Sequence, residues 1–320
     1  MTQNPKISII IPIYNVAQYI SNSLVSALNQ TYTPIEYIAI DDCSTDNSIS
    51  IVNEIIQMPQ YCTKDFKLLR HAENRGLSAA RNTGMQNASG DYIFFMDSDD
   101  EITTRCIELH YHAIKEVHAD FTIANIQLVG AKSLHIQSIN DKALEMSSIE
   151  SYFKKMWSVS AWNKLYSMRF LRDNNLWFKE DLIHEDILWS YLVAKSSTRL
   201  AIVKEATYIY KIRNNSITTS VSNPKKIGSL ISILDEISNY DQGDHVALKR
   251  QFVSFWKFNT ALLLLNFRGT TIQKKALYNA IRSVDPSCSS IYDIILNVPL
   301  WLFSVIFYLP YTLYKYFQRL

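Results

Sequence analysis

The fold is decided by residues 91–100, which have the sequence DYIFFMDSDD. The short apolar run at 92–96 is typical of a buried strand. Asp97, Asp99 and Asp100 follow at its carboxyl end, where crowded carboxylates are costly unless a cation or hydrogen-bond donors neutralise them. Ligands of open α/β sheets bind beyond the carboxyl ends of strands, and carboxylate oxygens suit Mg²⁺ or Mn²⁺. The stretch predicts a metal–diphosphate site; the alternative is that Asp100 caps a helix predicted over 102–117.

Strand and helix patterns alternate around this stretch. Apolar runs predict strands, and apolar residues at helical spacing predict helices between them. The predicted strands are 7–13, 36–40, 66–69 and 92–96, and the predicted helices are 17–30, 46–56 and 77–88. This alternation favours an α/β fold with a parallel sheet and helices on both faces.

The second half of the chain has a mixed pattern that becomes helical. Further strands are predicted at 121–126 and 200–204, and helices near 149–156, 187–195 and 252–267. A polar stretch at 214–226 is typical of a linker or loop. We therefore expect a main domain over residues 1–220 and a helical C-terminal region over 221–320.

Composition excludes several classes of protein. The 320 residues have a formal net charge of +2, so charge gives no sign of a nucleic-acid partner. The four cysteines are scattered without a Cys-x-x-Cys pair, which disfavours a zinc site or a disulfide framework and favours a reducing cytosol. The first apolar run, 7–13, is too short for a secretory signal peptide.

Polar blocks follow or adjoin the predicted strands. They have the sequences PIYN at 12–15, DDCSTD at 41–46, NRGLSAARNTG at 74–84, DSDD at 97–100 and HED at 184–186. Because the carboxyl ends of parallel strands meet at one edge of a sheet, most of these groups can gather in one crevice.

These blocks, in this order, resemble the pattern of glycosyltransferase family 2, the inverting nucleotide-sugar transferases of GT-A fold. The resemblance covers about residues 6–220. It implies a Rossmann-like mixed sheet flanked by helices. Cys43 replaces a glycine that is usual in the family's second block.

The resemblance implies a donor and metal site. Tyr14 and the backbone at Pro12 would contact the nucleotide base, and Asp41 or Asp42 would bind the base or ribose. Arg81 would face the nucleotide or its diphosphate, unless it forms a structural ion pair. Asp97 would contact the ribose or the donor sugar, and Asp99 would bind a Mn²⁺ or Mg²⁺ ion. Arg213 would belong to a segment that closes over the donor.

The resemblance also implies a base and an acceptor side. Asp186, next to Glu185, resembles the general base that takes the proton of the acceptor hydroxyl; the alternative is that Asp186 caps a helix starting at 187. Trp162, Asn163 and Lys164 resemble a Trp-Asn-Lys-Leu block expected to shape the acceptor side, although Trp162 is equally compatible with a core position.

The C-terminal run 294–314 has 21 residues and no charge. It is long enough to span a bilayer, but its two prolines, Asn297 and its Tyr and Trp residues favour an interfacial or re-entrant segment. A buried hairpin or an oligomer contact is the alternative. We expect association with the cytoplasmic face of the cell membrane, with Lys315 and Arg319 near anionic lipid.

The expected function is metal-dependent, inverting transfer of one sugar from a nucleotide sugar, with a UDP-sugar as the leading donor. The tail and the family favour a lipid-linked glycan of surface-polysaccharide biosynthesis as acceptor. One alternative is a sugar nucleotidyltransferase, which would have a glycine-rich loop after the first strand; residues 13–16 contain no glycine. The other is a non-catalytic membrane-associated scaffold of transferase fold.

Overall fold

The computed structural model describes residues 4–130, 139, 141–212, 224–239, 245–286 and 290–307. These residues form two compact units. The first contains 4–130, 139, 141–181 and 189–212, and the second contains 182–188 and the described residues from 224 onward. The predicted domain boundary at 220, and most of the predicted linker at 214–226, lie outside the described residues.

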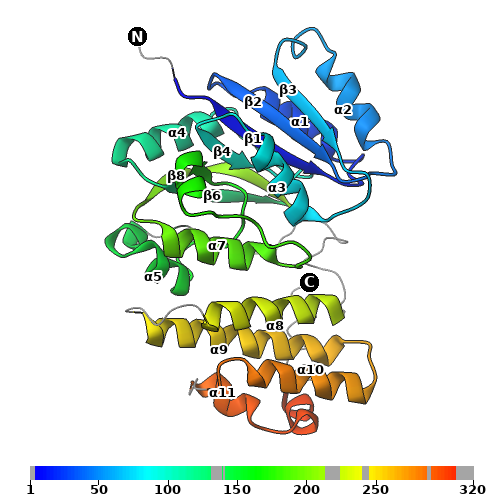
Figure 1. Cartoon of the computed structure of the whole chain (residues 1–320), viewed down its shortest axis with the longest axis vertical. Coiled ribbons are helices and arrows are strands. Elements are labelled where there is room, and N and C mark those ends of the chain that lie inside the picture. Colours follow the sequence, from blue (N-terminus) through cyan, green and yellow to red (C-terminus); the bar gives the residue numbers. More distant parts are fainter. Residues whose placement is uncertain are drawn as a thin grey trace. The chain divides into compact units, whose positions relative to one another are not determined.

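The first unit is built on an eight-stranded mixed sheet (Figure 1). Its strand order is β3-β2-β1-β4-β7-β6-β8-β5. β1, β2, β3 and β4 are mutually parallel, β7 runs antiparallel to β4 and β6, and β6 is parallel to β8. The strands are β1 (Ile7–Ile13), β2 (Ile35–Asp41), β3 (Asp65–Arg70), β4 (Tyr92–Phe95), β5 (Glu101–Ile102), β6 (Phe121–Val129), β7 (Leu165–Ser167) and β8 (Leu200–Lys211).

Helices flank this sheet, which confirms the predicted fold class. They are α1 (Ile20–Leu28), α2 (Ser48–Ile56), α3 (Leu77–Asn87), α4 (Cys106–Val117), α5 (Ser148–Phe153), α6 (Met168–Asp173) and α7 (Glu185–Ser196), with a 3₁₀ turn η1 (Asp141–Glu145). Successive residues of a strand point to opposite faces. Ile9 and Ile11 of β1 pack with α1, α2 and α4, whereas Ile10 faces α3. There a Cβ on Gly84 would lie 2.4 Å from the Ile10 side chain, so α3 lies very close to the sheet.

Residues after the acidic stretch differ from the prediction. Helix α4 begins at Cys106 with Arg105 as its N-cap, not near residue 102. Glu101 and Ile102 instead form the short strand β5, which pairs antiparallel with β8. The proposal that Asp100 caps this helix is therefore wrong, because the backbone after Asp100 is taken up by a strand.

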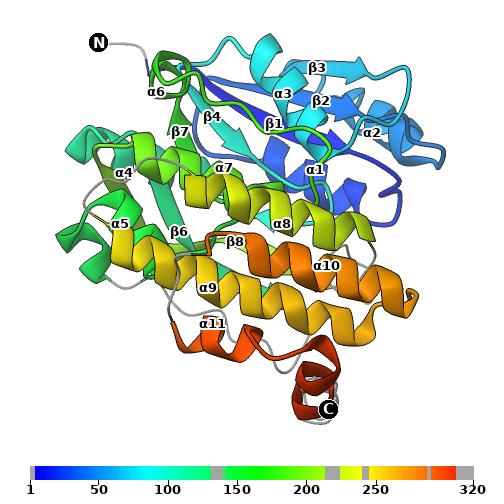
Figure 2. The same ribbon diagram turned by 60° about the horizontal axis from the view of Figure 1, so that its bottom comes forward.

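The second unit is helical, with α8 (Pro224–Asn239), α9 (Val246–Leu263), η2 (Leu264–Asn266), α10 (Thr271–Ser283) and α11 (Ile291–Leu296). α8, α9 and α10 lie side by side (Figure 2). Their core includes Ile227, Tyr278 and Phe303. Lys257, which interrupts the apolar run of α9, is buried in an ion pair with Asp293 at 3.0 Å.

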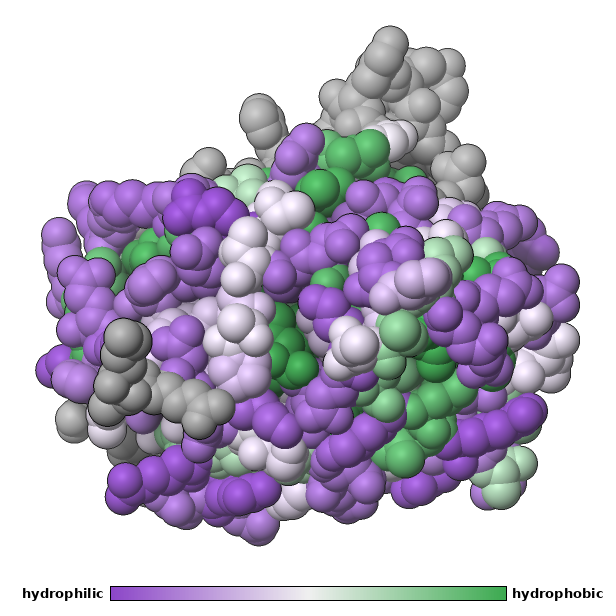
Figure 3. All heavy atoms as spheres, turned by 90° about the horizontal axis from the view of Figure 1, so that it is seen from above, coloured by the Kyte–Doolittle hydropathy of each residue, from purple (hydrophilic) through white to green (hydrophobic). Residues whose placement is uncertain are grey.

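The predicted membrane segment 294–314 is described up to residue 307, and 308–314 lie outside the described residues. Residues 300–307 form a further helical segment. Phe303 is buried, whereas Ile294, Trp301 and Val305 are 65%, 68% and 71% exposed. Within the described residues, no helix has both the length and the apolar character needed to cross a membrane. On the face drawn in Figure 3, hydrophilic residues predominate and apolar ones show as patches, which is common on protein surfaces.

Candidate functional site

The loops after β1 and β2 are tied to each other at the carboxyl end of the sheet. The Asn15 side chain accepts a hydrogen bond from the Thr45 N–H at 2.9 Å, and the Asn15 N–H donates to Ser44 Oγ at 3.3 Å. Tyr14, between β1 and this link, is 49% exposed. Pro12 is buried within β1 opposite Ile40 of β2. Of the two residues predicted to contact the base, Tyr14 is half-exposed at the end of β1, whereas Pro12 is buried.

The two aspartates after β2 have separate partners. Asp41 accepts the Ser44 N–H at 2.7 Å and pairs with Arg70 at 3.2 Å. Asp42 accepts the N–H groups of Arg75 and Gly76 at 2.8 and 2.7 Å.

His71 Nδ1 also lies 2.7 Å from Asp42 Oδ1. Asp42 thus fixes the start of α3, where Gly76 has a φ of +85° that favours glycine. Asp41 and Asp42 are both buried, and their predicted contacts with base or ribose stay predictions.

Arg81 is fully buried on α3. Its guanidinium donates to Asp97 Oδ1 at 2.9 Å and lies 5.2 Å from the centre of the Phe178 ring. Arg81 therefore forms an ion pair with the acidic stretch after β4, and its predicted contact with the nucleotide or its diphosphate stays a prediction.

Asp97, Asp99 and Asp100 form an acidic cluster in which one carboxylate oxygen from each lies within 4.8 Å of the others. Asp100 is fully buried; its Oδ1 accepts the Lys211 N–H at 2.9 Å, and its Oδ2 is buried without a hydrogen-bond partner among the described residues. Burial, helped by the charge of Asp97, raises the pKa of Asp100 to about 7 against the opposing effects of the Lys211 N–H and the Tyr208 hydroxyl. Three carboxylate oxygens this close together, in a cluster with an unsatisfied buried oxygen, fit a divalent cation.

Strand β8 supplies two residues that sequence reasoning did not identify. The Tyr208 hydroxyl accepts the Asp97 N–H at 3.1 Å, and Lys211 binds Asp100 through its backbone. The strand was predicted to end at residue 204, but it continues to Lys211. The alternation of aromatic residues at 208 and 210 is the signal that could have extended it.

The predicted base lies in the first turn of α7. Because α7 begins at Glu185, the alternative that Asp186 caps a helix from residue 187 is wrong. Glu185 is buried and Asp186 is partly exposed. Two carboxylates in a first helical turn are favoured by the helix dipole.

The segment 182–188 groups with the second unit, where the Ile183 N–H donates to Ser229 Oγ of α8 at 3.1 Å. His184, just before Glu185, has a left-handed φ of +68°. Burial, with the charge of Lys226, lowers the pKa of His184 to about 4, so it is neutral at pH 7.

The predicted acceptor block is directed into the protein. Trp162 is 8% exposed and stacks on Tyr208. Asn163 donates to two backbone carbonyls of β6 at 3.0 and 3.1 Å, and Lys164 donates to the Ser158 carbonyl at 2.9 Å. Their predicted effect on an acceptor stays a prediction. Arg213 lies outside the described residues.

Residues 8–174 match the model of Glycosyl transferase family 2. The chain belongs to this family. It is 34% identical over 272 residues to the glycosyltransferase GlyA of Streptococcus pneumoniae, covering 79% of this chain and 38% of that protein. The chain spans 47% and 64% of the next two curated relatives.

Solved structures have the same fold. A fragment of Staphylococcus aureus TarS in complex with UDP-GlcNAc superposes with a TM-score of 0.73 at 22% identity, covering 95% of this chain and 89% of that one. A mannosyltransferase of Pyrobaculum calidifontis, in complex with GDP-Man and Mn²⁺, gives 0.61 at 16% identity, covering 99% and 85%. The first unit therefore has the GT-A fold.

Proposed function

We propose that this chain is an inverting, metal-dependent glycosyltransferase that moves one sugar from a UDP-sugar to a saccharide acceptor. The observation that supports it most is the acidic cluster Asp97, Asp99 and Asp100 at the carboxyl end of β4, in a chain of this family. A buried Asp100 oxygen without a hydrogen-bond partner among the described residues is a strong reason to place a cation there.

The donor half uses the edge formed by β1, β2 and α3. Tyr14, half-exposed at the end of β1, would stack on the base. Asp41 and Asp42 lie at the end of β2 and would orient the base or ribose. The choice of a UDP-sugar is supported by TarS, whose structures hold UDP-GlcNAc and UDP.

A Mn²⁺ or Mg²⁺ ion would be held by Asp99, with Asp97 and Asp100 beside it. When bound, such an ion stabilises the charge that develops on the leaving diphosphate. Arg81 keeps Asp97 in place through its 2.9 Å hydrogen bond. Lys211 holds Asp100 through its N–H.

The chemical step needs one base. The acceptor oxygen attacks the anomeric carbon, the bond from that carbon to the diphosphate oxygen breaks, and Asp186 takes the hydroxyl proton. A single displacement inverts the anomeric centre. Glu185, in the same helical turn, would support Asp186 from a buried position.

A surface polysaccharide on a lipid carrier is the proposed acceptor class. TarS is named for transfer to poly(ribitol-phosphate), which supports a cell-surface polymer. The exposed Ile294, Trp301 and Val305 support contact with a membrane surface, because aromatic and aliphatic side chains bury at lipid interfaces.

The function is tested by heating the full chain with Mn²⁺ and each of a panel of nucleotide sugars, and by measuring their hydrolysis. We expect a rise in melting temperature with one donor. Asp186→Asn should retain that rise and lose hydrolysis, while Asp173→Asn, which changes an exposed acid on α6, should retain both. If no donor stabilises the protein, the proposed donor class is wrong; an active Asp186→Asn would exclude Asp186 as the base.

Membrane contact is tested by flotation with vesicles of phosphatidylglycerol and phosphatidylethanolamine. The double variant Trp301→Asn, Val305→Asn should float less than the wild type. Met58→Asn, which changes an exposed apolar residue of the first unit, is the matched control. Equal flotation of all three proteins would argue against contact through residues 301 and 305.

A further inference from the structure

A buried hydroxyl from β8 reaches two members of the acidic cluster. Tyr208 is fully buried, and its hydroxyl accepts the Asp97 N–H at 3.1 Å. The same hydroxyl contacts the carboxyl group of Asp100. Tyr208 also pairs with Ile102 where β5 and β8 meet, so the chain is held on both sides of the cluster.

The ring of Tyr208 is itself fixed by Trp162. The two rings are stacked, with centroids 4.3 Å apart and planes at 17°, and the Trp162 ring also stacks on Tyr210 at 5.3 Å and 11°. With 8% of Trp162 exposed, little of its surface is left for an acceptor.

A buried polar network fixes the loop that bears Trp162. Thr207 donates to the Asn163 side chain at 2.7 Å, and His110 lies 3.2 Å from the Thr207 hydroxyl. Asn163 has a left-handed φ of +58°, a conformation that asparagine adopts more readily than most residues, and these hydrogen bonds hold its side chain. Burial lowers the pKa of His110 to about 3, and the network therefore holds a neutral imidazole.

We propose that Tyr208, held by Trp162, is a positioning residue for the divalent cation of the acidic cluster. The inference rests on the proposed metal-dependent function. Tyr208 fixes the backbone at Asp97 and touches the carboxyl group of Asp100, so it sets the spacing of two carboxylates that the cation would need. It also gives the Trp-Asn-Lys block a role on the metal side of the site.

The test is the affinity of the full chain for Mn²⁺ alone, measured by titration calorimetry. Tyr208→Phe removes the hydroxyl and keeps the ring, and we expect it to weaken Mn²⁺ binding about tenfold, as loss of a residue that orients metal ligands commonly does. Excess Mn²⁺ should restore the rate of donor hydrolysis. Trp162→Leu keeps the hydroxyl but removes the stacked ring, and should weaken binding about threefold.

Tyr166→Phe is the matched control. The Tyr166 hydroxyl is equally buried in the same sheet, but it donates to the Ala161 carbonyl at 2.9 Å. Loss of stability alone would affect both Tyr→Phe variants, whereas loss of Mn²⁺ affinity should affect Tyr208→Phe alone. Unchanged Mn²⁺ affinity in Tyr208→Phe and Trp162→Leu would overturn the inference while leaving the metal site; a wild type that binds no Mn²⁺ would overturn both.

Discussion

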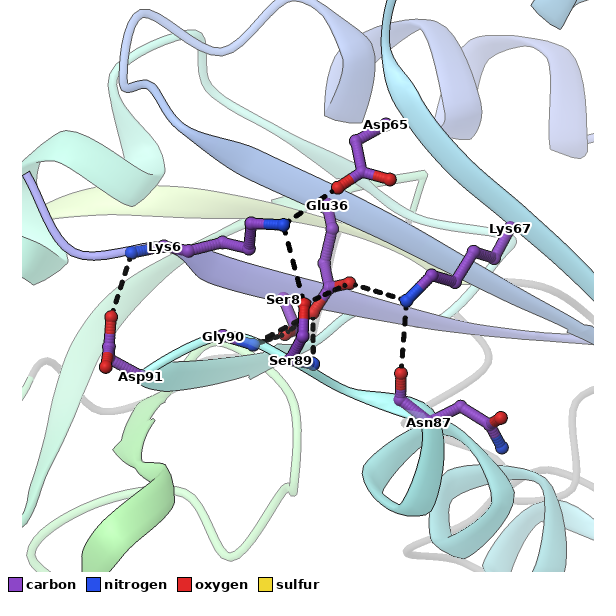
Figure 4. Close-up of polar contacts among 9 residues, drawn as sticks. All are labelled: Lys6, Ser8, Glu36, Asp65, Lys67, Asn87, Ser89, Gly90 and Asp91. Atoms are coloured by element: carbon purple, nitrogen blue, oxygen red, sulfur yellow. Dashed lines mark hydrogen bonds and ion pairs between the residues drawn. The ribbon is translucent and has the colours of Figure 1, made fainter.

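Two groups of acidic side chains lie at opposite ends of the parallel strands. At the amino end, the fully buried Glu36 of β2 accepts hydrogen bonds from Ser8, Ser89 and Gly90 and pairs with Lys67 at 3.0 Å (Figure 4). Burial alone would raise its pKa, but these donors outweigh burial and lower the pKa of Glu36 to about 2. Donors of the protein itself, together with Lys67, therefore stabilise this carboxylate in its charged form.

At the carboxyl end, the acidic cluster of Asp97, Asp99 and Asp100 shows the opposite balance. Burial and the charge of Asp97 raise the pKa of Asp100 to about 7, and one of its buried oxygens has no hydrogen-bond partner among the described residues. The opposite pKa shifts of Glu36 and Asp100 distinguish two roles of a buried acid. Glu36 stabilises the fold, whereas the cluster, under the proposed function, would be completed by a divalent cation.

The largest expected effect is on activity, from Asp99→Asn. Removal of this charge should lower kcat/KM about a thousandfold, because a divalent cation contributes several kcal/mol to stabilising the leaving group. The measurement is donor turnover at saturating Mn²⁺, with Mn²⁺ affinity measured in parallel.

Glu101→Gln is the control for that variant, since Glu101 lies in the same stretch but pairs with Lys211. It should stay within a few-fold of the wild type. If Asp99→Asn were as active as Glu101→Gln, the cluster would not hold the catalytic cation.

Replacement of Glu36, at the amino end of the strands, should lower stability and leave Mn²⁺ binding unchanged. Glu36→Gln should lower the free energy of unfolding at pH 7 by about 3 kcal/mol, since each unit of pKa shift corresponds to about 1.4 kcal/mol. Mn²⁺ affinity measured well below the melting temperature should be unchanged. Urea unfolding of both proteins measures the difference, and a loss of Mn²⁺ affinity would show that the two ends are coupled.

The stabilisation from Glu36 should depend on pH with a defined sign. Its folded-state pKa of about 2 lies below the ordinary 4.5, so the contribution is complete above about pH 4.5 and is lost as pH falls toward 2. The stability gap between wild type and Glu36→Gln should therefore narrow between pH 5 and pH 2. A gap that stays constant over this range would mean that Glu36 is not charged in the fold.

The sequence predicts only part of this difference between Glu36 and the acidic cluster. The strands and the acids at their carboxyl ends could be predicted, because an apolar run that stops abruptly at carboxylates is typical of a buried strand reaching the polar edge of a sheet. Strand β5 has two residues, too few for any periodicity to appear. The sequence therefore leaves a helix cap at Asp100 open as an alternative, although the backbone after Asp100 leads into the sheet.

The tertiary contacts of individual side chains are harder to predict from the sequence than the helices and strands. Nothing in the local pattern shows that Tyr208 meets Asp97, since the pair depends on the register of two strands more than a hundred residues apart. The Trp162 block matched its family pattern, but burial against Tyr208 and Tyr210 is a tertiary fact. The sequence does not single out Glu36, because one acid in an apolar strand gives no sign of the groups that will donate hydrogen bonds to it.

The smallest expected effect is on stability, from relief of backbone strain at Cys43, near the carboxyl end of the parallel strands. Cys43 follows Asp42 and has a left-handed φ of +64°, a conformation that costs an L-residue about 1–2 kcal/mol. Glycine at this position would avoid that cost but would lose about 0.5–1 kcal/mol through its greater loss of conformational entropy on folding. Cys43→Gly should therefore raise the free energy of unfolding by about 0.5–1 kcal/mol with Mn²⁺ affinity unchanged. Cys62→Gly, the same change at an exposed residue without a positive φ, should lower it by a similar amount. Urea unfolding compares the signs, and a destabilising Cys43→Gly would show that its thiol, 3.8 Å from the Ala72 carbonyl, outweighs the strain.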